Sequence, residues 1–229
     1  FDSAVAGEKV SYLIYLPPGY DKTPERRFPT VFWLHGIGGS QQGVPRLCER
    51  FTAAIAAGKA PETIFVFVNG MVDSFYCDAA KAKRPVESVI IKDLIPHIDA
   101  TYRTLGTRAG RMIEGFSMGG FGAAHFGFKY PELFGSISII DGALLGPAEM
   151  KSRHPAHFER IFGGSDEAFV AESPTGLAEK NADAVRGRTV IRMTVGALGP
   201  YNERYHALLQ AQKIAHEYVI DWPRIRAKN

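Results

Sequence analysis

The sequence has few cysteines, no long apolar run and no excess of charge of one sign. Its two cysteines among 229 residues, Cys48 and Cys77, exclude a disulfide-rich scaffold; they either form one disulfide or remain two buried thiols. The 27 basic and 24 acidic residues leave a net charge of +3, and no basic run is long enough to indicate nucleic-acid binding. No apolar segment approaches the length of a membrane span. We therefore expect no nucleic-acid partner, no membrane partner, and a solvated basic tail at 224–228.

The remaining composition is that of a globular protein. Hydrophobic residues make up 45% and charged residues 22% of the chain, values that disfavour disorder and coiled coil. A chain of 229 residues can bury one sizeable core, so we expect a single domain over 1–229. The sequence begins at Phe1 and not at a methionine, which slightly favours an exported protein, secreted or periplasmic, whose leader has been removed.

Short apolar runs alternate with amphipathic segments along the chain. The runs are rich in β-branched and aromatic residues and predict strands at 10–16, 30–34, 64–68, 137–140, 190–195 and 217–220. The intervening patterns predict helices at 46–57, 86–102 (with Pro96 as a kink), 118–130, 154–162, 166–171 and 202–214. This alternation predicts an α/β fold with a mostly parallel central sheet and helices on both faces.

The most informative motif is Gly115-Phe116-Ser117-Met118-Gly119, between a predicted strand and a predicted helix. It has the form of a nucleophile elbow, a sharp strand-to-helix turn that holds a serine hydroxyl above the edge of a sheet. A G-x-S-x-G pattern arises by chance in roughly one chain of this size in ten to twenty, so its weight comes from its context.

A second motif, His35-Gly36-Ile37-Gly38-Gly39, follows the predicted strand at 30–34. Attack by a serine on an ester creates a tetrahedral oxyanion, which backbone N–H groups stabilise. We expect one donor to be the N–H of Met118, directly after the serine, and the other to be the N–H of Ile37 in this glycine-rich loop. The alternative is a plain turn that ends the strand.

Together these segments resemble a known family. The matching segments are 12–20, 33–39, 73–78, 92–99, 114–122 and 128–131. They are similar to the α/β-hydrolase serine esterases related to feruloyl and acetyl xylan esterases (carbohydrate esterase family 1, esterase D-like). The resemblance implies an α/β-hydrolase fold, Ser117 as nucleophile, no metal and no organic cofactor. It also implies substrates that are feruloyl or acetyl esters of plant-wall carbohydrate, or small aryl esters.

The same resemblance suggests where the substrate binds. Gly36 and Gly38 would let the backbone approach the ester, and Tyr76 and Asp78 are candidate substrate contacts in an aromatic loop. For Tyr76 a role in packing that loop is an equal alternative.

The sequence departs from the family at the two partners that the serine needs. A carboxylate should follow the strand at 190–195, but the chain reads Gly196-Ala197-Leu198 there. A histidine should follow the last strand, yet no histidine occurs after His216. Asp141 is a weak candidate for the acid, and a turn-forming role before Gly142 is the stronger alternative. The other histidines fit the role of base poorly, and they are His97, His125, His154, His157 and His206.

Two explanations fit these gaps. Either the printed sequence omits residues after Gly196 and Ile220, where the acid and histidine loops belong, or both loops have been lost. We favour the omission, because a chain without catalysis has no physical need to keep a strained serine turn. If the printed sequence is complete, the alternative is a non-catalytic binding protein with an α/β-hydrolase fold. Acyl transfer to an acceptor other than water would use the same serine.

Overall fold

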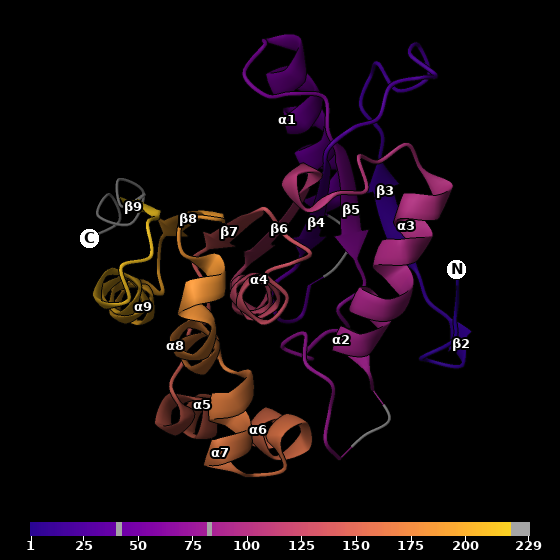
Figure 1. Ribbon diagram of the computed structural model, residues 1–229. Coiled ribbons are helices and arrows are strands. Elements are labelled where there is room, and N and C mark those ends of the chain that lie inside the picture. Colours follow the sequence, from indigo (N-terminus) through magenta and orange to yellow (C-terminus); the bar gives the residue numbers. More distant parts are fainter. Residues whose placement is uncertain (40–42, 82–83, 221–229) are drawn as a thin grey trace.

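A seven-stranded sheet forms the centre of the computed structural model, which describes residues 1–39, 43–81 and 84–220 (Figure 1). Its strands are β3 (Tyr12–Tyr15), β4 (Thr30–Leu34), β5 (Ile64–Val68), β6 (Arg111–Phe116), β7 (Ser136–Ile140), β8 (Val190–Val195) and β9 (Glu217–Ile220). They lie in the order β3-β5-β4-β6-β7-β8-β9, and only β3 is antiparallel to its neighbour. A separate hairpin pairs β1 (Asp2–Ser3) with β2 (Glu8–Lys9). The predicted fold class is confirmed.

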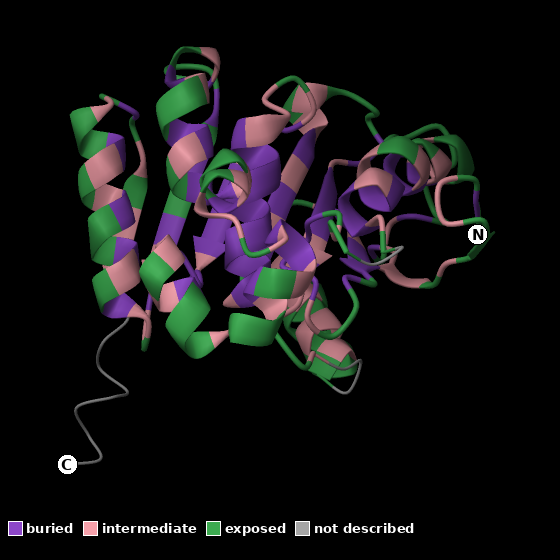
Figure 2. Cartoon of the chain, turned by 90° about the horizontal axis from the view of Figure 1, so that it is seen from below, coloured by how far each residue is buried: buried purple, intermediate pink, exposed green. Residues whose placement is uncertain are grey.

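The central strands are apolar because helices cover them. Phe32 and Leu34 of β4 and Ile113 of β6 have no exposed surface. A parallel sheet is normally buried on both faces, so its middle strands read as continuous apolar runs and do not alternate with polar residues. Figure 2 shows this distribution: buried residues gather in the middle of the molecule, and exposed residues lie on the outer sides of the helices.

The helices surround this sheet. They are α1 (Val44–Ala56), α2 (Val86–Ser88), the π-helix η2 (Val89–Leu94), α3 (Ile95–Thr101), the 3₁₀-helix η3 (Arg108–Gly110), α4 (Met118–Lys129), α5 (Pro147–Arg153), α6 (Pro155–Phe162), α7 (Asp166–Glu172), α8 (Pro174–Val185) and α9 (Gly199–Ala211). Within the described ranges, no helix is both long and apolar enough to cross a bilayer. The predicted tail at 224–228 lies outside the described residues.

The long helix predicted at 86–102 changes type midway. Residues Val89–Leu94 are π-helical, directly before α3, where Pro96 occupies the first turn. Proline has no N–H to donate, and its ring collides with the carbonyl four residues earlier, here that of Lys92. The wider π turn accommodates both effects, so the chain continues as a helix with a local change of winding where the sequence predicted a kink.

Four helices, α5 to α8, leave the sheet between β7 and β8 and gather below α4 in the view of Figure 1. Sequence reasoning predicted α6 and α7 but missed α5 and α8. Both missed helices begin with a proline, Pro147 and Pro174, at a position where its absent N–H costs nothing. The hydroxyl of Ser173 accepts a hydrogen bond from the Gly176 N–H and thereby caps α8. These start signals were present in the sequence, but the segments that follow them show no strong apolar periodicity.

The burial of β6 predicts a large loss of stability when its core side chain is shortened. Ile113→Ala should lower the free energy of unfolding by about 2–5 kcal/mol, because it removes buried apolar surface and leaves a cavity. Urea denaturation measures this change. The matched control is Val190→Ala in β8, whose side chain is 71% exposed, and it should shift the midpoint only slightly. Equal shifts for the two variants would contradict the placement of β6 at the centre of the core.

Candidate functional site

Ser117 lies in a sharp turn between β6 and α4, at the edge where the parallel strands end. Its backbone has φ 57° and ψ −113°, a conformation that costs a non-glycine residue on the order of 1–3 kcal/mol. The surrounding backbone holds it there: its N–H donates to the Ile140 carbonyl at 3.0 Å, and its carbonyl accepts from the Ala143 N–H at 2.9 Å. The side chain is half-buried, and its hydroxyl forms no hydrogen bond with any residue that the structure describes.

The glycines of the motif are required by space. A Cβ on Gly115 would lie 2.1 Å from the Gly119 carbonyl oxygen. A Cβ on Gly119 would lie 2.0 Å from the Leu34 carbonyl oxygen at the end of β4. The first turn of α4 therefore touches the ends of β4 and β6 directly, and this contact brings Ser117 beside the loop that follows β4.

The loop 35–39 lies against the serine turn, as the sequence predicted for the two motifs. A Cβ on Gly36 would lie 3.4 Å from the Cβ of Ser117. Gly38 has φ 65°, and its N–H donates to the Val72 carbonyl at 2.7 Å. Within the described part of the chain, the N–H groups of Ile37 and Met118 have no acceptor. Both are thus available as donors next to Ser117.

His35 fastens this loop and does not face the serine. Its Nδ1 lies 2.8 Å from the Gly36 carbonyl oxygen, and its Nε2 lies 3.3 Å from the Gly70 nitrogen. A carbonyl only accepts and an N–H only donates, so Nδ1 carries the proton and Nε2 accepts. The ring is therefore a neutral bridge between the loop 35–39 and the segment after β5.

Large apolar side chains stay exposed around Ser117. Phe116 precedes the serine and is 46% exposed, while Ile37 in the facing loop is 42% exposed. Met71 and Val72, in the segment whose carbonyl binds Gly38, are 41% and 59% exposed. An apolar group bound next to the serine would remove this surface from water.

The two predicted substrate contacts of the aromatic loop both form hydrogen bonds within the chain, Tyr76 in the core and Asp78 on the surface. Tyr76 has no exposed surface, and its hydroxyl donates to the His35 carbonyl at 3.0 Å. Asp78 accepts hydrogen bonds from the N–H and the hydroxyl of Ser88, at 3.0 and 2.6 Å. These bonds agree with the packing alternative for Tyr76, and contact of either residue with substrate stays a prediction.

Asp141 holds the turn after β7. It has φ 44°, and its Oδ1 accepts from the N–H groups of Gly196 and Leu198 at 2.9 and 2.8 Å. The loop from β8 to α9 contains only the residues 196–198, so Asp141 closes it onto the neighbouring strand. This geometry fits the turn-forming alternative, and the role of Asp141 as the acid of a triad stays a prediction.

No histidine in the described ranges bonds to Ser117. His97 bonds Tyr12, His125 bonds Glu87, His154 and His157 pack on Phe75, and His206 bonds His216. The serine turn and the glycine-rich loop thus come together without a visible base. The two cysteines, Cys48 and Cys77, are unpaired in the structure, and burial raises the pKa of each thiol.

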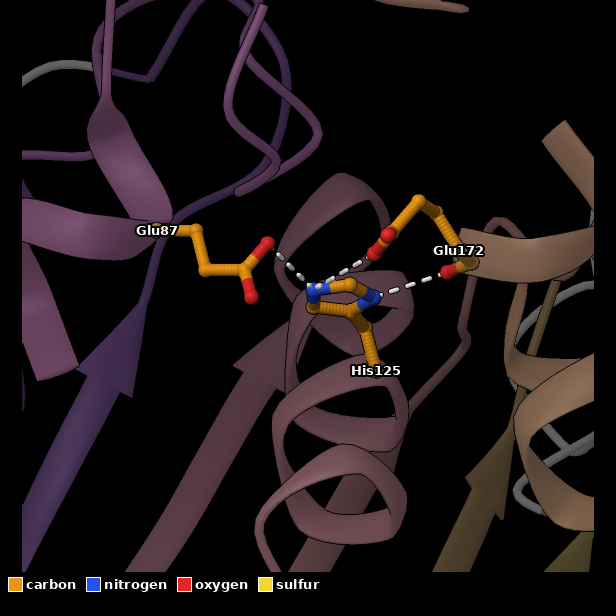
Figure 3. Close-up of side chains that lie close together, drawn as sticks. All are labelled: Glu87, His125 and Glu172. Carbon is orange, nitrogen blue, oxygen red and sulfur yellow. Dashed lines mark hydrogen bonds and ion pairs between the residues drawn. The ribbon is translucent and has the colours of Figure 1, made fainter. Parts of the chain in front are cut away.

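Sequence reasoning missed a buried cluster of charged side chains on the far part of α4. Figure 3 shows His125 between Glu87 of α2 and Glu172 of α7. The Nε2 of His125 lies 3.1 Å from Glu87, its Nδ1 lies 2.7 Å from the Glu172 carbonyl oxygen, and Lys129 pairs with both carboxylates. Only the helical spacing of His125 and Lys129 could have indicated it, and their partners are distant in sequence.

This cluster does not suit a metal ion, although three of its ligand atoms lie within 4.8 Å of one another. The Lys129 ammonium already lies 2.7 Å from Glu87 and 2.5 Å from Glu172. Both nitrogens of His125 already lie within hydrogen-bond distance of oxygen atoms, so a metal ion would have to displace these contacts as well. We interpret the cluster as an ion network that joins α2, α4 and α7.

Burial alone would raise the pKa of Glu87, but hydrogen bonding and charge from His125, with bonds from Lys129 and Tyr130, bring it down to about 2. A pKa below the unfolded value means that ionised Glu87 stabilises the fold above about pH 4.5 and loses this effect as pH falls toward 2. Glu87→Gln should therefore cost on the order of 2–3 kcal/mol at neutral pH and much less near pH 3.

Chemical denaturation at both pH values measures this difference. The exposed Glu179 on α8 provides the control Glu179→Gln, which should change stability little at either pH. A Glu87→Gln cost that did not shrink on acidification would contradict the ionised network.

Comparisons with known proteins show the family of the chain. Residues 3–213 match a family model described as "Putative esterase". The chain is 29% identical over 194 residues to an endo-1,4-beta-xylanase/feruloyl esterase of Xylanibacter ruminicola, covering 81% of this chain and 26% of that protein. It is 31% identical over 166 residues to Esterase Rv1288 of Mycobacterium tuberculosis, covering 71% of this chain and 33% of that protein. The chain thus spans a third or less of the length of these two relatives.

A solved structure of a ferulic acid esterase superposes with a TM-score of 0.81 at 20% identity, over 96% of this chain and 86% of that one. At this identity the similarity concerns the fold, and the structure has the same mostly parallel sheet surrounded by helices. The family match covers nearly the whole chain. The chain therefore belongs to the Esterase family and has the α/β-hydrolase fold.

Proposed function

We propose that this chain is a serine carboxylesterase that hydrolyses esters through an acyl-enzyme on Ser117. The observation that carries the proposal is the turn at Ser117, flanked by two backbone N–H groups, those of Ile37 and Met118, that have no acceptor within the described residues. Strained non-glycine residues that the surrounding structure holds in place are concentrated at functional sites. Membership of the Esterase family supports the same reaction.

The reaction would begin with attack of the Ser117 hydroxyl oxygen on the ester carbonyl carbon. The carbonyl oxygen becomes an oxyanion, which the N–H groups of Ile37 and Met118 stabilise; Met118 adds the positive end of the α4 dipole. Collapse of the tetrahedral intermediate releases the alcohol with a proton and leaves Ser117 acylated. Water then attacks the acyl carbon, and the acid and free Ser117 are released.

The proton transfers need a base that contacts Ser117. We assign this role to a histidine on a segment that the printed sequence does not contain and that belongs after Ile220, as the acid loop belongs after Gly196. Asp141 is a weaker candidate for the acid than a carboxylate on an additional segment after Gly196, since the Asp141 carboxylate already holds the 196–198 loop. The proposal needs no metal and no organic cofactor, because serine, N–H donors and a base complete the reaction.

The surroundings of Ser117 favour esters with an apolar or aromatic group. Ile37, Met71, Val72 and Phe116 offer exposed apolar surface there, and Gly36 and Gly38 leave room for the substrate beside the backbone. One relative is named a feruloyl esterase. We propose feruloyl or acetyl esters of plant-wall carbohydrate, or small aryl esters, as the substrate class. Asp78 is exposed and stays a candidate substrate contact, whereas Tyr76 is buried and would act by packing the aromatic loop.

A second candidate is a non-catalytic protein that binds carbohydrate or another ligand on the same fold. It is favoured by one observation: no histidine or carboxylate in the described ranges bonds to Ser117. Loss of triad members leaves only weak residual catalysis.

Hydrolysis of 4-nitrophenyl acetate and methyl ferulate tests the first candidate. Ser117→Ala should lower kcat/KM by about 10⁴-fold or more, since the nucleophile is gone while binding remains. The exposed Ser152 on α5 gives the control Ser152→Ala, which should keep wild-type rates. Equal rates for wild type and Ser117→Ala would refute the nucleophile.

Intact mass separates the two candidates. A purified protein that hydrolyses these esters and has a mass clearly above 25.1 kDa would support a base on an additional segment. A mass of 25.1 kDa, with no turnover and no labelling of Ser117 by an aryl fluorophosphonate, would favour the binding protein.

A further inference from the structure

The ring of Tyr76 occupies a slot that two glycines make. A Cβ on Gly70 would lie 2.2 Å from its Cε1, and a Cβ on Gly122, in α4, would lie 2.5 Å from its Cδ2. Neither glycine has a positive φ, so space and not backbone freedom explains both. The segment after β5 and the helix after Ser117 thus clasp one aromatic ring from two sides.

The backbone that presents this ring is strained. Phe75 and Tyr76 have φ of 51° and 60°, each of which costs on the order of 1–3 kcal/mol. Ser74 holds the strained pair: its hydroxyl oxygen accepts from the Tyr76 N–H at 2.9 Å and donates to the Gly70 carbonyl. We interpret this strained backbone as the conformation that places the Tyr76 hydroxyl against the glycine-rich loop 35–39.

That hydroxyl meets the glycine-rich loop at its first carbonyl. It donates to the His35 oxygen at 3.0 Å, and a Cβ on Gly119 would lie 2.9 Å from the same oxygen. Burial raises the pKa of the Tyr76 phenol well above its ordinary value, so it stays a donor. The start of the loop is therefore fixed between Tyr76 and the first turn of α4.

Other bonds fix the rest of the loop to the same segment. Gly70 donates to His35 Nε2, and Gly38 donates to the Val72 carbonyl. These contacts bracket Ile37 on both sides and leave its N–H without an acceptor in the described part of the chain. The direction of this N–H thus depends on the segment 70–76.

We propose that Tyr76 is the positioning residue of this loop, whose buried hydroxyl holds the His35 carbonyl so that the Ile37 N–H stays aimed at the ester oxyanion. The proposal rests on the proposed function of Ser117. Tyr76 itself does not touch the substrate, because its ring has no exposed surface and its hydroxyl is occupied. It acts on the transition state through the loop.

The variant Tyr76→Phe keeps the ring in its slot and removes only the donor. The freed His35 carbonyl would turn toward another donor and rotate the loop. Because an oxyanion donor acts mainly in the transition state, kcat for 4-nitrophenyl acetate should fall about 10–100-fold while KM changes less than about 2-fold. The preference for an ester over its thionoester should fall too. A well-aligned oxyanion hole favours oxygen because sulfur accepts hydrogen bonds poorly, and misaligned N–H groups lose this discrimination.

The matched control is Tyr130→Phe. Tyr130 follows the last residue of α4, far from Ser117, and its phenol hydroxyl donates to the buried carboxylate of Glu87 in α2. The variant should alter stability but leave kcat and the ester-to-thionoester ratio unchanged. Hydrogen–deuterium exchange of peptides covering 34–39 gives a readout that does not need activity: exchange should accelerate in Tyr76→Phe and not in Tyr130→Phe.

Unchanged kcat, thionoester ratio and loop exchange in Tyr76→Phe would overturn the proposal, as would equal effects in both variants. Gly122→Ala, which pushes on the ring itself, should act in the same direction as Tyr76→Phe. Activity retained in Ser117→Ala would overturn the proposed function instead. In that case faster exchange of 34–39 in Tyr76→Phe would still show that Tyr76 holds the loop 35–39, without a catalytic consequence.

Discussion

The direct contact between the first turn of α4 and the ends of β4 and β6 determines the geometry of the candidate site. Gly115 and Gly119 leave no room for a side chain between these elements. The serine between them is therefore held at a positive φ. The same contact brings the loop after β4 alongside, because Gly119 lies on the Leu34 and His35 carbonyls.

The composition of the loop 35–39 predicts a flexible backbone, since three of its five residues are glycine. The structure compensates for this from outside the loop. The segment 70–76 supplies the Val72 carbonyl, the Gly70 N–H and the Tyr76 hydroxyl. Preorganised donors stabilise a developing charge because they need no rearrangement during the reaction. A rigid neighbour can thus make a glycine-rich loop suitable for that task.

The far half of α4 has a different role. There, Glu87, His125, Lys129 and Glu172 form an ion network that joins helices from distant parts of the chain. Removal of one partner would leave an uncompensated buried charge, which is costly in a low-dielectric interior. One helix therefore presents the serine at its first turn and anchors the α5–α8 excursion at its other end.

The sequence by itself determined the order of the strands along the chain, the α/β class and the pairing of the Ser117 turn with the glycine-rich loop, because local apolar runs and glycine spacing encode them. Helices without strong apolar periodicity, such as α8, could not be predicted from the sequence. Only the tertiary structure decided that Tyr76 is clasped by Gly70 and Gly122, that Asp141 closes the loop 196–198, and that His125 joins two distant glutamates. These contacts link residues far apart in the chain, and local sequence patterns do not record which distant surfaces will pack together.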